Sequence, residues 1–196
     1  MITMKKIILL LSLSVGLGLS NLSFAQANDF KVYKQCSDET EWSCDVIRKV
    51  NGQKEIYFKG IKSPNVEQLN ADYYHVAASC GNPCQVHAFI GRDKKHEDTT
   101  DGFVTVDPKT QCLIESDDKK NRLTARQLNS DKKIELARLN QKLFNDLWIP
   151  DYGKYMPFQN HSHFDGHGNL VLIADYIEPI QGKSQFKQTY LNPCKL

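Results

Sequence analysis

The chain has 196 residues, of which 40% are apolar and 24% are charged, and its formal net charge is +2. These values exclude an intrinsically disordered chain, which combines low hydrophobicity with a high net charge. Residues 1–25 hold two lysines and no acidic residue, so the rest of the chain carries equal numbers of basic and acidic side chains. This balance disfavours nucleic acid as a partner, because phosphate binding needs a basic surplus.

The first 25 residues have the pattern of a signal peptide. Lys5 and Lys6 precede an apolar run over 7–19, and the small residues Ser23 and Ala25 follow it. This order predicts cleavage after Ala25. A helix over 7–19 spans only about 20 Å, less than the roughly 30 Å of a bilayer's hydrocarbon layer. We therefore expect residues 26–196 to form one exported domain without a membrane span, located in the periplasm or secreted.

All of the cysteines follow the predicted cleavage site, and an even number in an exported protein predicts disulfides. They are Cys36, Cys44, Cys80, Cys84, Cys112 and Cys194. We expect the local pairs Cys36–Cys44 and Cys80–Cys84, which leaves Cys112–Cys194. A redox pair at Cys80 and Cys84, or a zinc site formed by these two with His75 and His87, is the alternative. An oxidising compartment favours the disulfides.

Strand patterns dominate the chain. Asn51-Gly52 joins the alternating runs 44–50 and 53–58, and this pair of residues favours a type I′ hairpin turn. Further strands are expected, in chain order, at 73–79, 85–90, 103–106, 112–115 and 122–127. The polar segment 91–101 is predicted to be a loop.

One segment has the periodicity of a helix. Ser130 is a candidate N-cap, and Pro150 would end the helix. The apolar residues between them fall on one helical stripe. They are Leu136, Leu139, Leu143 and Leu147, widened by Ala137, Phe144 and Trp148. The sequence thus predicts a single-domain, β-rich α+β fold of antiparallel hairpins, stapled by disulfides, with one amphipathic helix packed on a face.

The segment from His161 to His167 is the densest in chemically active side chains. On a strand, His161, His163 and Asp165 would share one face, where they could bind zinc and leave a position open for water. That arrangement would suit a metal-dependent envelope hydrolase acting on peptidoglycan or peptide. The alternative is a hairpin turn over 165–169, because Asp, Gly and Asn favour turns and an apolar strand follows at 170–177. We favour the turn.

Other catalytic templates are missing from the sequence. It contains no nucleophile elbow, no phosphate-binding glycine loop and no dinucleotide fingerprint. Each cysteine also has a plausible disulfide partner. We therefore expect no catalytic residues, no bound metal and no cofactor, and we favour a binding protein over an enzyme. An exported structural or ligand-carrier protein is also compatible with the sequence, and the oligomeric state is left open.

The layout resembles the periplasmic immunity proteins that neutralise toxins delivered between competing bacteria, such as those of type VI secretion. The features shared are the signal peptide of 1–25, one β-rich domain of about 170 residues, and paired cysteines including Cys80-Gly-Asn-Pro-Cys84. The resemblance implies a stoichiometric complex with a cognate effector or envelope enzyme, with loops inserted into its cleft. The candidate loops are 92–101, with Arg92, Lys94 and Lys95, and the turn 165–169, with Asp165 and His167.

Overall fold

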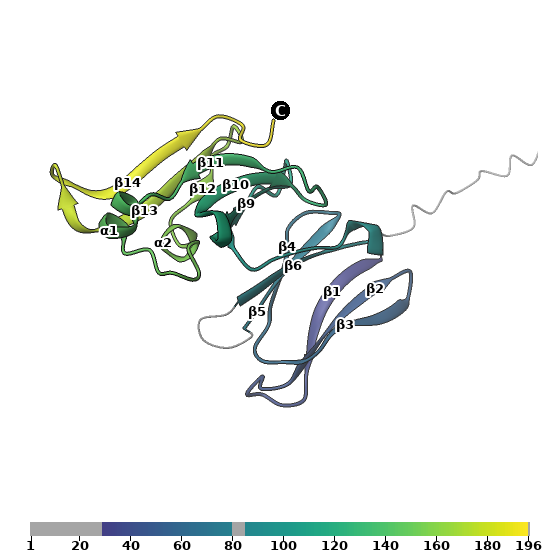
Figure 1. The fold of residues 1–196 in the computed structure, drawn as a ribbon. Helices are drawn as coiled ribbons and strands as arrows, with labels where there is room; N and C mark the ends of the chain where they lie inside the picture. The colour runs from purple at the N-terminus through teal and green to yellow at the C-terminus, as the bar shows by residue number, and fades with distance from the viewer. Residues whose placement is uncertain (1–28, 80–84, 196) are drawn as a thin grey trace, which may run out of the picture.

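A computed structural model describes residues 29–79 and 85–195 (Figure 1). Four antiparallel sheets follow one another along the chain, and each is built from consecutive strands. Sheet A contains β1 (Phe30–Cys36), β2 (Cys44–Val50) and β3 (Gln53–Ile61). Sheet B contains β4 (Asn65–Gln68), β5 (Tyr73–Ser79), β6 (Gln85–Gly91) and β7 (Asp98–Thr100).

The second half of the chain forms the other two sheets and the α-helices. Sheet C contains β8 (Phe103–Val106), β9 (Cys112–Asp117), β10 (Arg122–Gln127) and β11 (Ile134–Arg138). Sheet D contains β12 (His163–Phe164), β13 (Leu170–Ile180) and β14 (Lys183–Tyr190). Between sheets C and D the chain forms the helices α1 (Gln141–Leu147) and α2 (Met156–Gln159). The predicted β-rich antiparallel fold is confirmed.

Local turn chemistry produces several of the predicted hairpins. Asn51 and Gly52 both have positive φ, at 50° and 80°, and they connect β2 to β3 with Val50 opposite Gln53. The type I′ turn needs these angles, which asparagine and glycine tolerate best. β5 and β6 pair as predicted. The segment that connects them, with the predicted Cys80–Cys84 disulfide, lies outside the described residues, as does the predicted signal peptide.

The four sheets pack against one another in chain order. Sheets A and B share a core that includes Val46, Val76 and Ile90. Sheets B and C share a second core that includes Phe89 and Leu113. A third core joins sheets C and D with both α-helices, and its buried members are Val104, Cys112, Ile114, Leu123, Ala125, Leu139, Leu147, Ile149, Tyr155, Phe158, Leu170, Leu172 and Ala174. Sheets B and C are thus covered on both faces.

The predicted helix after Ser130 is only partly correct. Residues Ile134–Arg138 form strand β11, which pairs with β10, and the helix begins later, with Asn140 as its N-cap. The Asn140 side chain accepts a hydrogen bond from the backbone N–H of Leu143. The half-buried residues Ile134, Leu136 and Ala137 fit a helix as well as a strand with a bulge, and pairing with β10 selects the strand. The shortened helix packs on β13 as predicted.

Two predicted disulfides are present. Cys36 and Cys44 lie directly opposite each other on β1 and β2. Cys112 and Cys194 join the start of β9 to the C-terminal end, across 82 residues of sequence. The second bridge closes much the longer loop, so it removes more conformational freedom from the unfolded chain.

The two bridges should therefore differ in their effect on stability. Loop-closure entropy predicts a loss of about 4–5 kcal/mol in unfolding free energy for the pair of changes Cys112→Ala and Cys194→Ala. The matched pair Cys36→Ala and Cys44→Ala should lose only about 2–3 kcal/mol. Urea unfolding of the two double variants measures both values. Equal losses would contradict the ranking by loop length.

Two histidines contact each other between sheets B and C. His75 Nε2 lies 2.9 Å from His87 Nδ1, and the two rings are stacked. His75 also stacks on Phe89, and His87 stacks on Phe103 with ring centroids 4.3 Å apart. Burial lowers the pKa of both histidines to about 4, and for His87 the charge of His75 adds to the effect. The pair is therefore neutral at pH 7.

This pair should make folding sensitive to acid. Between about pH 6.5 and pH 4 the unfolded chain takes up protons at His75 and His87 that the native protein does not bind. The unfolding free energy therefore has its full value above about pH 6.5. It falls as the pH is lowered toward 4, by up to about 3 kcal/mol for each histidine. Urea unfolding at several pH values measures the slope.

Two variants test the assignment of that slope. A double variant with His75→Phe and His87→Phe should have a flatter profile, because neither position can titrate. Phe89→Leu is the control, since it removes a stacking partner of His75 without removing a titrating group. It should lower the stability equally across the window, and a flattened profile in this control would contradict the assignment.

Candidate functional site

The histidine segment forms the predicted hairpin. β12 pairs with β13, with His163 opposite Val171. The Asp165 carboxylate accepts hydrogen bonds from the backbone N–H groups of His167 and Asn169 and from the Asn169 side chain. The Asn169 backbone N–H is the main reason that the pKa of Asp165 lies below its usual value. The Asp165 carboxylate thus stabilises the turn through these hydrogen bonds.

The structure does not bring the three proposed metal ligands together. His161 Nε2 lies 3.2 Å from a carboxylate oxygen of Asp175, whereas His163 Nδ1 contacts the backbone oxygen of His161. Within residues 29–79 and 85–195, the one group with metal-ligand atoms within 4.8 Å of one another is Cys36, Glu41 and Cys44. Its cysteines are joined in a disulfide, so they offer no thiolate to a metal.

The first predicted partner loop is more ordered than expected. Asp98–Thr100 forms strand β7 on β6, which corrects the prediction of an unpaired loop over 91–101. The Arg92 guanidinium lies over the Phe30 ring at 5.5 Å, and Lys94 forms an ion pair with Glu55. Lys95 is exposed and lines a polar hollow of about 500 Å³.

Four charged groups of that hollow pair with one another. Arg126, which is buried, donates to both carboxylate oxygens of Asp98 and to Glu115. Lys133 lies 2.6 Å from Glu115. Burial alone would raise the pKa of Glu115, but Arg126 and Lys133 outweigh it and hold that pKa below its usual value. The network joins sheets B and C.

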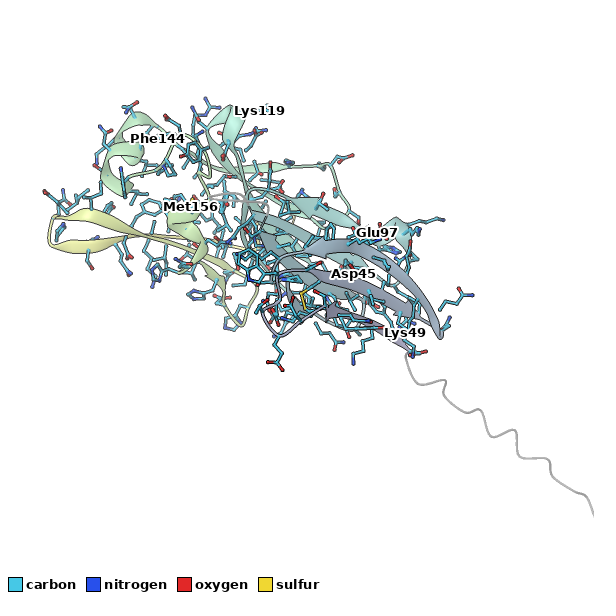
Figure 2. The ribbon with its side chains drawn as sticks, turned by 90° about the horizontal axis from the view of Figure 1, so that it is seen from below. Asp45, Lys49, Glu97, Lys119, Phe144 and Met156 are labelled. Carbon is cyan, nitrogen blue, oxygen red and sulfur yellow. A yellow bond between two sulfur atoms is a disulfide. The ribbon has the colours of Figure 1, made fainter. Side chains whose placement is uncertain are left out.

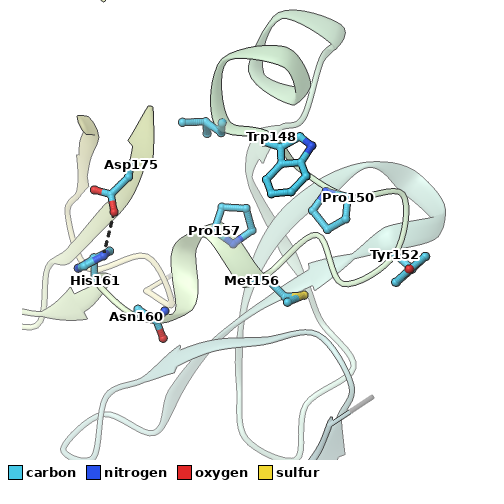
Figure 3. Close-up of a pocket in the computed structure, with 9 residues that line it drawn as sticks. Trp148, Pro150, Tyr152, Met156, Pro157, Asn160, His161 and Asp175 are labelled. Atoms are coloured by element: carbon cyan, nitrogen blue, oxygen red, sulfur yellow. Dashed lines mark ion pairs between the residues drawn. The ribbon is translucent and has the colours of Figure 1, made fainter. Parts of the chain in front are cut away.

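A larger, mainly apolar groove of about 570 Å³ lies beside sheet D (Figure 3). The segments that line it are the end of α1, the connection to α2, α2 with the residues after it, and β13. The lining residues are Leu147, Trp148, Pro150, Tyr152, Met156, Pro157, Asn160, His161 and Asp175. Figure 2 shows Phe144 and Met156 at the end of the molecule opposite Lys49 of sheet A.

Three large side chains of this groove are exposed to solvent. Trp148 is 82% exposed, Tyr152 is 65% exposed and Met156 is 42% exposed. The helical stripe predicted from the sequence placed Trp148 in the core, and that prediction is wrong. Trp148 is the C-cap of α1 and adopts a left-handed conformation, with φ 48° and ψ 53°, while its neighbours Leu147 and Ile149 are buried. This turn directs the indole outward.

The connection between α1 and α2 is held by a buried lysine and an aspartate from sheet C's β9–β10 turn. The Asp118 carboxylate accepts hydrogen bonds from the backbone N–H groups of Gly153 and Lys154. Lys154 Nζ donates to the backbone oxygens of Asp118 and Asp151. Because Lys154 is buried, these bonds satisfy an ammonium group that water reaches poorly. They fix the backbone on both sides of Tyr152.

The opposite end of the groove is polar. His161, which follows α2, forms its ion pair with Asp175 of β13, as the dashed line in Figure 3 marks. Both side chains are exposed, and the second oxygen of Asp175 accepts a hydrogen bond from Gln185 on β14. The groove thus combines an aromatic surface with one acidic group at its far end.

This arrangement is suited to binding. Exposed tryptophan, tyrosine and methionine on an ordered backbone are typical of protein contact surfaces. The described lining contains no serine, threonine, cysteine or lysine that could act as a nucleophile beside His161. Sequence reasoning missed this groove, although one signal was available, since aromatic residues cluster around Pro150 and Gly153, where no helix can continue.

Within the described residues, no helix is long and apolar enough to cross a membrane. Comparison with protein-family models, curated proteins and solved structures finds no match for this chain. The function is therefore argued from the groove itself.

Trp148 should weaken the fold rather than support it. Its left-handed backbone costs a side chain with a Cβ about 1 kcal/mol compared with glycine. Trp148→Gly should therefore raise the unfolding free energy by about 1 kcal/mol. The neighbouring change Leu147→Ala should lower it by about 2–4 kcal/mol, because Leu147 is buried. Urea unfolding compares them, and a destabilised Trp148→Gly variant would show that the indole serves the fold.

Proposed function

We propose that this chain is an exported binding protein that forms a stoichiometric complex with a protein partner, and that the Trp148 groove is its contact surface. The observation that carries the proposal is the exposure of Trp148 at a backbone position where glycine is the favoured residue. Residues held in a costly conformation cluster at functional sites. Tryptophan and tyrosine also dominate the binding energy of protein interfaces.

The sequence supports the compartment and the class of partner. A signal peptide over 1–25 and two disulfides fit an oxidising compartment such as the periplasm. The layout resembles periplasmic immunity proteins, so the partner we propose is a toxin or an envelope enzyme that the complex inhibits. The groove replaces the two loops expected from the sequence as the main contact.

The chain provides its own control for the groove. Trp42 is 64% exposed but lies in sheet A's β1–β2 connection, where the Lys62 ammonium sits 3.4 Å from its ring centroid. Trp148 and Trp42 are thus two exposed tryptophans with different surroundings. If the groove is the contact surface, only Trp148 should matter for binding.

The test begins with residues 26–196 immobilised and an extract of the source cells passed over them. The retained partner is then purified and titrated against wild type, Trp148→Ala and Trp42→Ala. We expect a 1:1 complex that Trp148→Ala weakens by about 30-fold or more, as for an interface hot spot. Trp42→Ala should change Kd by less than about twofold. Equal affinities in all three proteins, or no retained partner, would contradict the proposal.

A further inference from the structure

The groove ends at a strand edge that is open. β13 lies between β12 and β14, but β12 has only two residues and pairs with Leu170 and Val171. At Ile173 of β13, a side chain takes the place of a neighbouring strand. The Ser162 hydroxyl accepts a hydrogen bond from the Ile173 N–H at 3.0 Å and donates one to the Ile173 C=O at 3.3 Å. Beyond Ile173, no strand of the described chain pairs with this side of β13.

The backbone of Asp175 faces this open side. In an antiparallel pair, the N–H and C=O groups of alternate residues point to the same neighbour. Since those of Ile173 bind Ser162 rather than β14, those of Asp175 also point away from β14. The regular register with β14 extends to Asp175, opposite Gln185, and two residues further on Ile177 is 59% exposed. The backbone N–H and C=O of Asp175 therefore lie on the open side of β13, beside the groove.

The open edge is short and lacks the usual protection. The neighbouring edge strand β14 carries Lys183 and Lys187, and lysines on an edge strand discourage pairing. The β13 edge instead exposes Ile177. Pairing with β14 becomes irregular after Asp175, and Pro179 has no N–H to donate. The free part of this edge is therefore short and suits one extended segment.

The charge around the edge is acidic. Asp175 belongs to the groove, Asp151 lies between the lining residues Pro150 and Tyr152, and Glu178 follows on β13. Within the described chain, the one ion pair formed by these three carboxylates is that of Asp175 with His161, and none of them pairs with a lysine or arginine. A partner segment with basic side chains complements this surface.

We propose that the β13 edge at Asp175, together with the groove, receives an extended strand of the partner, with an apolar side chain near Trp148 and a basic side chain near Asp175. This inference rests on the proposed function and specifies the partner's structure. Main-chain hydrogen bonds to the edge would supply part of the affinity, and the groove would select the side chain.

Synthetic octapeptides test the inference directly. The probe is a pool that alternates Lys with Leu, Val or Phe, titrated against a Trp42→Phe variant in which Trp148 is the sole tryptophan. We expect peptides that shift the Trp148 fluorescence. N-methylation of the alternate amides that face β13 should weaken binding by at least about tenfold, because those hydrogen bonds are lost. Methylation of the other amides should have an effect of less than about twofold.

Three further outcomes separate this inference from the proposed function. Replacing Lys by Glu in the peptides should weaken binding at least severalfold, and equal binding would overturn the assigned charge. Absence of binding by every peptide at about 1 mM, or equal effects of both methylation patterns, would overturn strand addition. If a captured partner depends on Trp148 but does not compete with the peptides, the proposed function stands and the strand inference fails.

Discussion

Sheet C is packed on both faces, and this constraint fixes the order of the layers. Side chains along β9 alternate between its neighbours, so that Leu113 faces sheet B and Ile114 faces sheet D. Arg126 adds a polar link, because it binds Glu115 in its own sheet and Asp98 in sheet B. A buried ion pair favours one register only when its hydrogen bonds are complete, and here both carboxylates are bound. The two halves of the molecule are thus joined through one sheet.

The core between sheets C and D also determines where the groove lies. Leu147, Ile149, Tyr155 and Phe158 are all buried in that core, so the chain between α1 and α2 is anchored at both ends. Between these anchors Lys154 is buried, whereas Trp148 and Tyr152 lie outside the core. Trp148 and its exposed neighbours therefore gather on one outer surface, beside the strand that the same core holds in place. The groove is therefore a consequence of which residues of the α1–α2 segment are buried in the core.

Features set by local chemistry could be predicted from the sequence. Asn51-Gly52 specifies its hairpin, and Asp165 specifies its turn, through backbone preferences that need no distant partner. Two predictions that relied on apolar spacing alone failed. Residues 134–138 fit both a helix and a strand, and only their pairing with β10 selects the strand. Trp148 has the spacing of a core residue, and only its left-handed backbone removes it from the core. The position of the groove depends on where α1 begins and on the outward direction of Trp148, so the sequence alone could not locate it.

Amide hydrogen exchange of the complex tests the central claim most directly, since it maps the contact surface without any substitution. The free chain and its complex with the captured partner are compared over all residues 26–196. The account predicts new protection at 147–161 and at Asp175, with exchange at 92–97 and 165–169 nearly unchanged. Protection confined to those two loops, with none at the Trp148 groove, would contradict it.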